Sequence, residues 1–492
     1  MDTDFSLLPV LSIVIPLGAA GAILGFRRHV AMRDAISVVA AVAQFAVVIS
    51  LAPTVLSGST AGITLFTVLP GIDFAFRADP LAMVFATIAS LLWISAAVYS
   101  IGYMRSLDEH AQTRFFICFS ISLSAAAGGA FAANLFTLVI FYEVLSLITY
   151  PLVYHHEDDE AWFGSRRYMV YLMGASKTFL LAALAMTYQF AGTLDFKPGG
   201  LFNDTGLSSG LLIAIYLCYL AGFAKAAIMP FHAWLPAAMV APTPVSALLH
   251  AVAVVTMGVF CVLRVIFDVM GLRLMHELGL GTATAYLVSF TIIMASIYAL
   301  TRDDLKARLA YSTVSQLSYI ILGAALLSPS GIVGGVAHIP AHALSKITLF
   351  FCAGSIYCAA RLRKISDMAG IGWRLPWTMA AFFVGSLGMI GIPPSGGFIS
   401  KWYLVLGTVE AQDIVFLIVL LASAVLNAAY FLPVSYTAFF VKANPDRTMP
   451  VAVEEIREIP LVTVPLVATA IFSVIMGLYP DYFLALARGV VP

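Results

Sequence analysis

Apolar stretches of about twenty residues recur along almost the whole chain, separated by short polar segments. A helix of that length and character is what crosses the hydrocarbon core of a bilayer. Of the 492 residues, 61% are hydrophobic and only 11% are charged, against about 25% charged residues in soluble proteins. This composition excludes a soluble enzyme, a disordered chain and a nucleic-acid-binding protein. We therefore predict an all-α polytopic membrane protein, embedded in the lipid bilayer.

The pattern predicts about fourteen membrane-spanning helices. Two spans contain internal prolines, Pro230 and Pro236 in one and Pro393 and Pro394 in the other, so we expect two broken helices. Residues 62–79 are too interrupted to span and are expected to form a short extramembrane hairpin. The predicted spans are 6–26, 34–55, 80–104, 113–132, 134–154, 168–191, 209–232, 245–267, 280–301, 304–327, 331–360, 376–408, 412–441 and 460–480.

The positions of the basic residues predict the orientation. Most lysines and arginines between the spans fall in alternate loops, beginning with the loop after the first span, and Arg166, Arg167 and Arg447 belong to this group. Cytoplasmic loops carry the excess of Lys and Arg. We therefore expect an inner-membrane protein with both termini outside. The acidic N-terminus argues against a cleaved signal peptide, and the five cysteines form no Cys-x-x-Cys pair.

Five charged residues lie inside predicted spans, where a charge at the bilayer centre costs at least ~2.5–3.5 kcal/mol. They are Lys177, Lys225, Lys346, Lys401 and a single carboxylate, Glu143. Snorkelling or a structural ion pair between helices is the alternative interpretation. A path for protons or other ions is favoured, because a buried lysine can be loaded or unloaded by a nearby charge.

Buried histidines extend this set. His338, His342 and Lys346 follow one another at intervals of four residues and share one helix face. His250 is a further candidate within a span. A metal site at the histidine pair is disfavoured because no Glu, Asp or Cys ligand accompanies it. We predict no metal and no cofactor, and we assign no role to four loop histidines, His29, His110, His155 and His156. The segment HHEDDE at 155–160 is interpreted as a solvated loop.

The chain shows signs of an internal repeat. Lys225 and Lys401 each lie beside a broken span, and Lys177 and Lys346 lie in the spans before them at nearly the same separation. Units of five spans must be inverted relative to each other in the membrane, as in many transporters. We predict an N-terminal three-helix segment with the hairpin (1–112), a first five-helix repeat (113–267), a second, inverted repeat (280–441) and a C-terminal loop and last helix (442–492).

Four motifs resemble the antiporter-like subunits of respiratory complex I, Mrp-type sodium/proton antiporters and energy-converting membrane-bound hydrogenases, and they occur in the order of that family. They are GFAKAAIMPFHAWLPAAMVAPTPVSALLHA (222–251), LKARLAYSTVSQLSYIILG (305–323), HIPAHALSKITLFF (338–351) and PPSGGFISKWYL (393–404). The resemblance implies fourteen core helices with two inverted five-helix repeats, which agrees with the span count.

The resemblance also assigns roles to individual residues. It implies that Glu143 and Lys225 form an ion pair that gates a proton half-channel. His250 resembles a histidine of the complex I subunit with the long lateral helix and of its Mrp counterpart, whereas Lys177 has no expected counterpart in most relatives. The remaining matched residues are Lys306 on the tenth helix, His338, His342 and Lys346 on the eleventh, and Lys401 at the exit.

The predicted function is therefore a proton-translocating, or cation/proton-translocating, antiporter-like subunit of a multi-subunit membrane complex. Its expected partners are other antiporter-like subunits and small membrane subunits, and the expected ions are protons, alone or exchanged for Na+. We predict no redox site in this chain. Any enzymatic activity would therefore belong to the complex as a whole, which could be related to NADH:quinone oxidoreductase or to hydrogenase. An Mrp antiporter and an inorganic-carbon-accumulating complex stay open, as do a solitary transporter of a small solute and a membrane-embedded lipid transferase.

Overall fold

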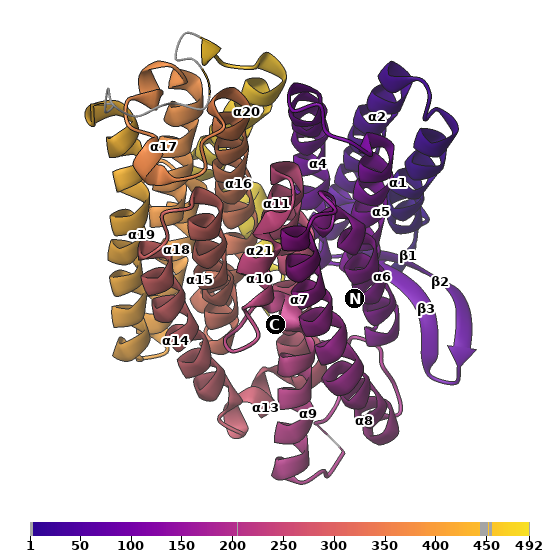
Figure 1. Cartoon of the computed structure of the whole chain (residues 1–492). Coiled ribbons are helices and arrows are strands. Elements are labelled where there is room, and N and C mark those ends of the chain that lie inside the picture. Colours follow the sequence, from indigo (N-terminus) through magenta and orange to yellow (C-terminus); the bar gives the residue numbers. More distant parts are fainter. Residues whose placement is uncertain (1–2, 204, 443–450, 452–454, 492) are drawn as a thin grey trace.

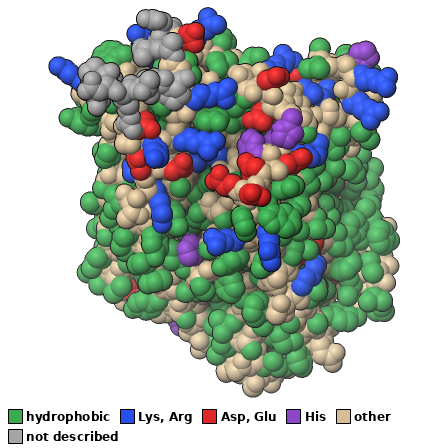
Figure 2. All heavy atoms as spheres, in the orientation of Figure 1, with side chains coloured by type: hydrophobic (Ala, Val, Ile, Leu, Met, Phe, Trp, Pro, Cys, Tyr) green, Lys and Arg blue, Asp and Glu red, His purple; other side chains and the backbone are tan. Residues whose placement is uncertain are grey.

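The computed structural model describes residues 3–203, 205–442, 451 and 455–491. They form a bundle of long helices with a small β-sheet projecting at one side (Figure 1). Within this described part, eleven helices are long and apolar enough to cross a membrane. On the face shown in Figure 2, charged and histidine side chains gather toward one end, above a broad apolar zone. This distribution is that of a multi-pass membrane protein.

The first part of the bundle carries the sheet. Its helices are α1 (Leu8–Gly25), α2 (Val30–Ser50), α3 (Ala52–Leu56), α4 (Pro80–Ser106), α5 (Gln112–Ala130) and α6 (Leu135–Val153). Strand β1 (Thr3–Phe5) pairs in parallel with β2 (Thr60–Leu69), which pairs in antiparallel with β3 (Ile72–Ala78). The hairpin predicted for residues 62–79 is present, in β2 and β3.

Two helical segments contain three π-helical turns that the sequence did not predict. One continues from α7 (Asp159–Ala175) through η1 (Ser176–Leu180) into α8 (Leu181–Ala191). The other two interrupt one long segment, made of α11 (Thr243–Ala247), η4 (Leu248–Val252), α12 (Val254–Arg264), η5 (Val265–Met270) and α13 (Gly271–Glu277). Such turns are rare and frequently occur at functional sites. Lys177 lies in the first turn and His250 in the second.

Both predicted helix breaks are present. After α9 (Ser209–Gly222) and the 3-10 turn η2 (Ala224–Ala226), the chain runs without regular structure to the short helices α10 (Trp234–Ala237) and η3 (Ala238–Val240). The second break separates α17 (Pro376–Ile390) from α18 (Gly396–Glu410). A proline lacks the N–H that continues a helix, and each break leaves carbonyl oxygens without helical partners.

The remaining helices complete the second half. They are α14 (Leu280–Leu300), α15 (Leu305–Ala325), α16 (Pro329–Ala360), α19 (Ile414–Phe440), α20 (Pro460–Leu478) and α21 (Asp481–Arg488), with the short turns η6 (Ile365–Asp367) and η7 (Ile371–Trp373). Helix α16 runs through the middle of this half and packs against α15, α17, α18 and α20. Residues placed on its faces are therefore enclosed by helices on several sides.

Two details differ from the sequence prediction. Helix α7 begins at Asp159, before the predicted residue 168, so Arg166 and Arg167 lie in a helix and not in a loop. The predicted spans 209–232, 304–327 and 376–408 are not among the eleven helices, so the count of fourteen and the inverted repeats stay predictions. Arg447 lies outside the described residues.

Candidate functional site

An ion pair joins helix α6 to the segment made of α7 and η1. The Nζ atom of Lys177 lies 3.0 Å from Oε2 of Glu143, and the two side chains are 51% and 15% exposed. The pair therefore lies at the lateral surface of the isolated chain. The resemblance implied that Glu143 would pair with Lys225; in the structure, the ion pair found for Glu143 is with Lys177.

Lys225 is fully buried in the 3-10 turn of the first break. Its Nζ donates to the carbonyl oxygen of Tyr142 and lies 3.5 Å from the centroid of the Tyr142 ring. Its backbone N–H donates to the Tyr142 hydroxyl over 3.3 Å. Lys225 thus contacts helix α6 at the residue next to Glu143, and the contact is to neutral groups.

Gly258 on α12 allows the 3-10 turn that carries Lys225 to pack directly against this helix. A Cβ at Gly258 would lie 2.2 Å from the backbone N of Ala226 and 2.3 Å from the carbonyl carbon of Lys225. Both atoms belong to the backbone, so they cannot move aside as a flexible side chain would. Glycine at this position therefore fixes the close approach of α12 to the turn that carries the lysine.

A second cluster surrounds Lys346 on α16. Its Nζ donates to the Ser312 hydroxyl over 2.9 Å and to the carbonyl oxygen of Leu309 over 3.4 Å, both on α15. The Tyr430 hydroxyl, from α19, is in hydrogen-bonding range of Ser312 Oγ at 3.1 Å and also donates to Asn427 Oδ1. All four polar side chains are fully buried.

The hydrogen bonds continue from this cluster toward the second break. Gln316 Nε2 donates to Asn427 Oδ1 over 3.4 Å, and Gln316 Oε1 lies 3.1 Å from His338 Nε2. His338 Nδ1 lies 2.8 Å from the hydroxyl of Ser400, the residue before Lys401. Because a carboxamide oxygen only accepts, Nε2 of His338 carries the hydrogen in this arrangement. We call the connected side chains the polar row, which comprises Lys346, Ser312, Tyr430, Asn427, Gln316, His338 and Ser400.

Lys401 lies directly after the end of this row. Its Nζ donates to the carbonyl oxygens of Met389 and Ile390 over 2.6 and 3.2 Å. These are the last two residues of α17, whose terminal carbonyls lack helical partners. A cation at a helix C-terminus also interacts favourably with the helix dipole. The second break therefore creates the binding environment of this lysine.

Three further predicted residues, Lys306, His250 and His342, also lie outside the polar row. Lys306 on α15 donates to the carbonyl oxygen of Ala241 over 2.5 Å and lines a cavity of about 260 Å³ together with His156 and Glu160. Both ring nitrogens of His250, and Nε2 of His342, are buried without a hydrogen-bond partner within the described residues.

The sequence singled out the charged residues of the candidate site but not the neutral residues that contact them. It did not single out Tyr142, Ser312, Gln316, Ser400, Asn427 or Tyr430. The only local signal was the spacing of Ser312 and Gln316, four residues apart on one face of α15.

Two further expectations were wrong. Glu143, expected to be the one carboxylate inside a span, is only partly buried, whereas Asp34, Asp79 and Asp268 are buried. These three are paired with arginines: Asp34 with Arg33, and both Asp79 and Asp268 with Arg264. In addition, the segment 155–160 is not a solvated loop throughout, because the His155 side chain is fully buried.

Comparison with known proteins places the chain in one family. The sequence profile described as NADH:quinone oxidoreductase/Mrp antiporter, TM matches residues 132–427, and that of NADH-Ubiquinone oxidoreductase (complex I), chain 5 N-terminus matches residues 70–116. NADH-quinone oxidoreductase subunit N of Desulforudis audaxviator is 31% identical, and the alignment covers 97% of each chain. The chain belongs to this antiporter-like family. The family predicted from the four motifs is thereby confirmed.

Other relatives come from different complexes of the antiporter-like family. Hydrogenase-4 component B of Escherichia coli is 31% identical over 67% of this chain, and a probable K(+)/H(+) antiporter protein of Rhizobium meliloti is 29% identical over 98% of it. The chain spans about half the length of these two proteins. A chain of the Mrp complex from Dietzia sp. DQ12-45-1b shares the fold, with a TM-score of 0.88 and 21% identity, covering 99% of this chain and 96% of that one.

Members of the family are proton-translocating, antiporter-like subunits of complex I, Mrp and hydrogenase complexes. The matched region, residues 132–427, contains all nine residues predicted for the site. The comparisons do not assign roles to individual residues.

Proposed function

We propose that this chain translocates protons, alone or in exchange for Na+, as a subunit of a multi-subunit complex of the inner membrane. The observation that supports this most directly is the polar row, which extends without interruption from Lys346 to Ser400. Amines, hydroxyls and imidazoles can accept and release protons, whereas the carboxamides of Gln316 and Asn427 orient their neighbours.

The other charged residues have distinct proposed roles. Glu143, Lys177 and Lys225 form a switch around helix α6, because the acid pairs with one lysine and the neighbouring residue binds the other. Lys401 is the outlet of the polar row. The central relay consists of His250, Lys306, His338, His342 and Lys346.

This function implies an architecture and partners. Two inverted five-helix repeats, 113–267 and 280–441, would place the two broken helices symmetrically within a fourteen-helix fold, with both termini outside. Moving one elementary charge against 100 mV requires ~2.3 kcal/mol. Because no redox site is proposed for this chain, other members of the complex would supply that energy.

Substitution of Lys346 tests the proposal. Lys346→Met keeps a long apolar side chain and removes the charge from the polar row. In inverted membrane vesicles, we expect loss of ion translocation, measured with a pH-sensitive dye, while the subunits still co-purify. Lys364→Met is the matched control, because Lys364 is exposed in a loop and outside the row. Translocation at the control rate in the Lys346→Met vesicles would contradict the proposed path.

A further inference from the structure

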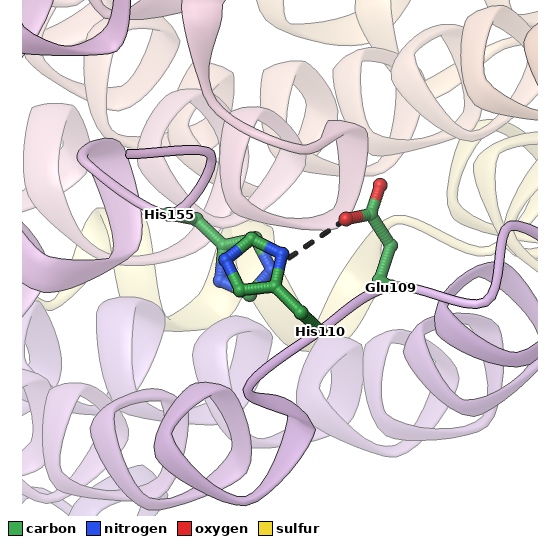
Figure 3. Close-up of side chains that lie close together, drawn as sticks. All are labelled: Glu109, His110 and His155. Carbon is green, nitrogen blue, oxygen red and sulfur yellow. Dashed lines mark ion pairs between the residues drawn. The ribbon is translucent and has the colours of Figure 1, made fainter. Parts of the chain in front are cut away.

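Three potential metal ligands meet between two loops at one end of the bundle, outside the polar row. Glu109 and His110 belong to the loop between α4 and α5, and His155 belongs to the loop between α6 and α7 (Figure 3). Their ligand atoms all lie within 4.8 Å of one another. The rings of His110 and His155 stack with centroids 4.7 Å apart. The two loops are far apart in the sequence, and these residues carry no role in the proposed ion path.

Glu109 is the centre of this group. Its Oε2 lies 3.7 Å from Nε2 of His155 and 3.8 Å from Nδ1 of His156. Carboxylate oxygens and imidazole nitrogens are both ligands that zinc accepts in proteins.

His155 supplies an independent indication of a ligand. Its side chain is fully buried, yet within the described residues neither ring nitrogen has a hydrogen-bond partner, because the 3.7 Å contact of Nε2 with Glu109 is longer than a hydrogen bond. Buried polar side chains are nearly always hydrogen-bonded, and leaving one without a partner costs about 1–3 kcal/mol. Figure 3 shows the ring directed toward His110 and Glu109. A metal ion that accepts the lone pair of a His155 ring nitrogen would remove the free-energy cost of leaving that nitrogen without a partner.

One positive side chain contacts the site directly. Arg114 donates to the backbone carbonyl of His155 over 3.4 Å. Arg114 also forms an ion pair with Glu157, which offsets its charge. Its hydrogen bond to the loop holds His155 in place.

We propose that Glu109, His110 and His155 bind a divalent transition-metal ion of the zinc class. Two imidazoles and one carboxylate form a typical zinc ligand set, and they leave a fourth position for water or a further side chain. His156, which already contacts Glu109, is the side chain placed to take it. Zinc–ligand distances of about 2.0–2.2 Å require ligand atoms roughly 3.4 Å apart, so ligand atoms that now lie up to 4.8 Å apart must approach by up to about 1.4 Å on binding.

A bound ion would connect two loops that are separate in the chain. It would fasten the α4–α5 loop to the α6–α7 loop, beside the cavity that His156 and Lys306 line. It would also replace the negative charge of Glu109 with a net positive charge at that end of the cavity. The site therefore offers a means of regulating access to Lys306.

Metal content of the purified complex tests the site. The complex is equilibrated with Zn2+, freed of excess ion and analysed by mass spectrometry, and binding of Co2+ is followed by its ligand-field absorption. The comparison is among the unmodified chain, His155→Ala, His110→Ala and a control, His29→Ala, which removes an exposed loop histidine. Because His110 is exposed, its substitution preserves the fold even where loss of the buried His155 does not.

We expect one Zn2+ more per chain in the unmodified and His29→Ala complexes than in the two site variants. Affinity should fall by at least about tenfold in His110→Ala, since loss of even an outer-shell partner costs about 10–100-fold. Equal zinc content in all four complexes would overturn the proposal, as would a Co2+ spectrum unchanged in His110→Ala. These readouts are independent of ion translocation, so they separate this site from the proposed function.

Discussion

The two predicted repeats stabilise their lysines in different ways. In the first, Glu143 and Lys177 form an ion pair at a half-exposed lateral position, and Lys225 contacts neutral groups of the residue next to Glu143. In the second, Lys346 and Lys401 contact only hydroxyl and carbonyl oxygens in the hydrogen bonds found for them. The first region therefore carries opposite charges that can separate, and the second a continuous row of mostly neutral groups.

This difference indicates a division of labour. An ion pair near a surface responds strongly to a neighbouring protein chain, because changes in solvation and nearby charge alter the energy of both partners. A row of fully buried and mostly neutral groups is isolated from solvent and from such changes, as the proposed conduit requires. Within the first region, a change at Glu143 can reach Lys225 through Tyr142, to which Lys225 is hydrogen-bonded.

The largest expected effect on translocation concerns Lys225, the buried lysine of the proposed switch. Lys225→Ala should abolish translocation, because it removes the lysine of the first break while leaving the Glu143–Lys177 pair intact. Translocation is measured in inverted vesicles, and assembly by co-purification of the other subunits. The matched control is Lys197→Ala, in the loop between α8 and α9. A Lys225→Ala complex that pumps normally would remove the lysine from the switch.

An intermediate effect is expected for the ion pair itself. Glu143→Gln and Lys177→Met should each reduce translocation severalfold, since each leaves its partner without a counter-charge. If the two residues act as a unit, the double variant should be little worse than either single variant. If the fold-reductions of the two single variants instead multiply in the double variant, the pair is structural. The two regions then do not differ as described.

The smallest expected effect concerns the neutral part of the row. Tyr430→Phe removes only a hydroxyl and interrupts the connection between Ser312 and Asn427. Loss of one net hydrogen bond should cost about 1 kcal/mol of stability. Translocation should fall modestly while the complex stays assembled.

Tyr216→Phe is the matched control for this variant. Tyr216 is also fully buried, and its hydroxyl bonds to Thr284 over 2.7 Å, outside the polar row. Both variants should lose similar thermal stability, and only Tyr430→Phe should slow translocation. Equal rates in the two variants would mean that protons bypass the tyrosine.

The sequence predicted the helical architecture and the charged site residues, because both depend on strong local signals. Apolar length identifies a span, and a lysine such as Lys346 within a span is costly enough to stand out. The two breaks followed from prolines. These features need no knowledge of which helices are neighbours.

The neutral residues and the ion pairing could not be predicted in this way. Serine, tyrosine and asparagine are common in helices, and Tyr430 becomes significant only because its hydroxyl reaches Ser312 on α15. The π-helical turn that carries Lys177 has no known local signal, although the lysine on it reaches Glu143. His155 was assigned to a solvated loop because its segment is rich in acidic residues, whereas tertiary packing buries it.

The hydroxyl of Tyr430 has one hydrogen and two acceptors within reach, Ser312 Oγ and Asn427 Oδ1. It can donate fully to only one of them at a time. At any instant the tyrosine therefore directs its proton either toward the side of Lys346 or toward the side of Gln316. The two arrangements differ by rotation about one C–O bond. The hydrogen bond donated by Tyr430 can therefore switch between Ser312 and Asn427 without displacing any helix.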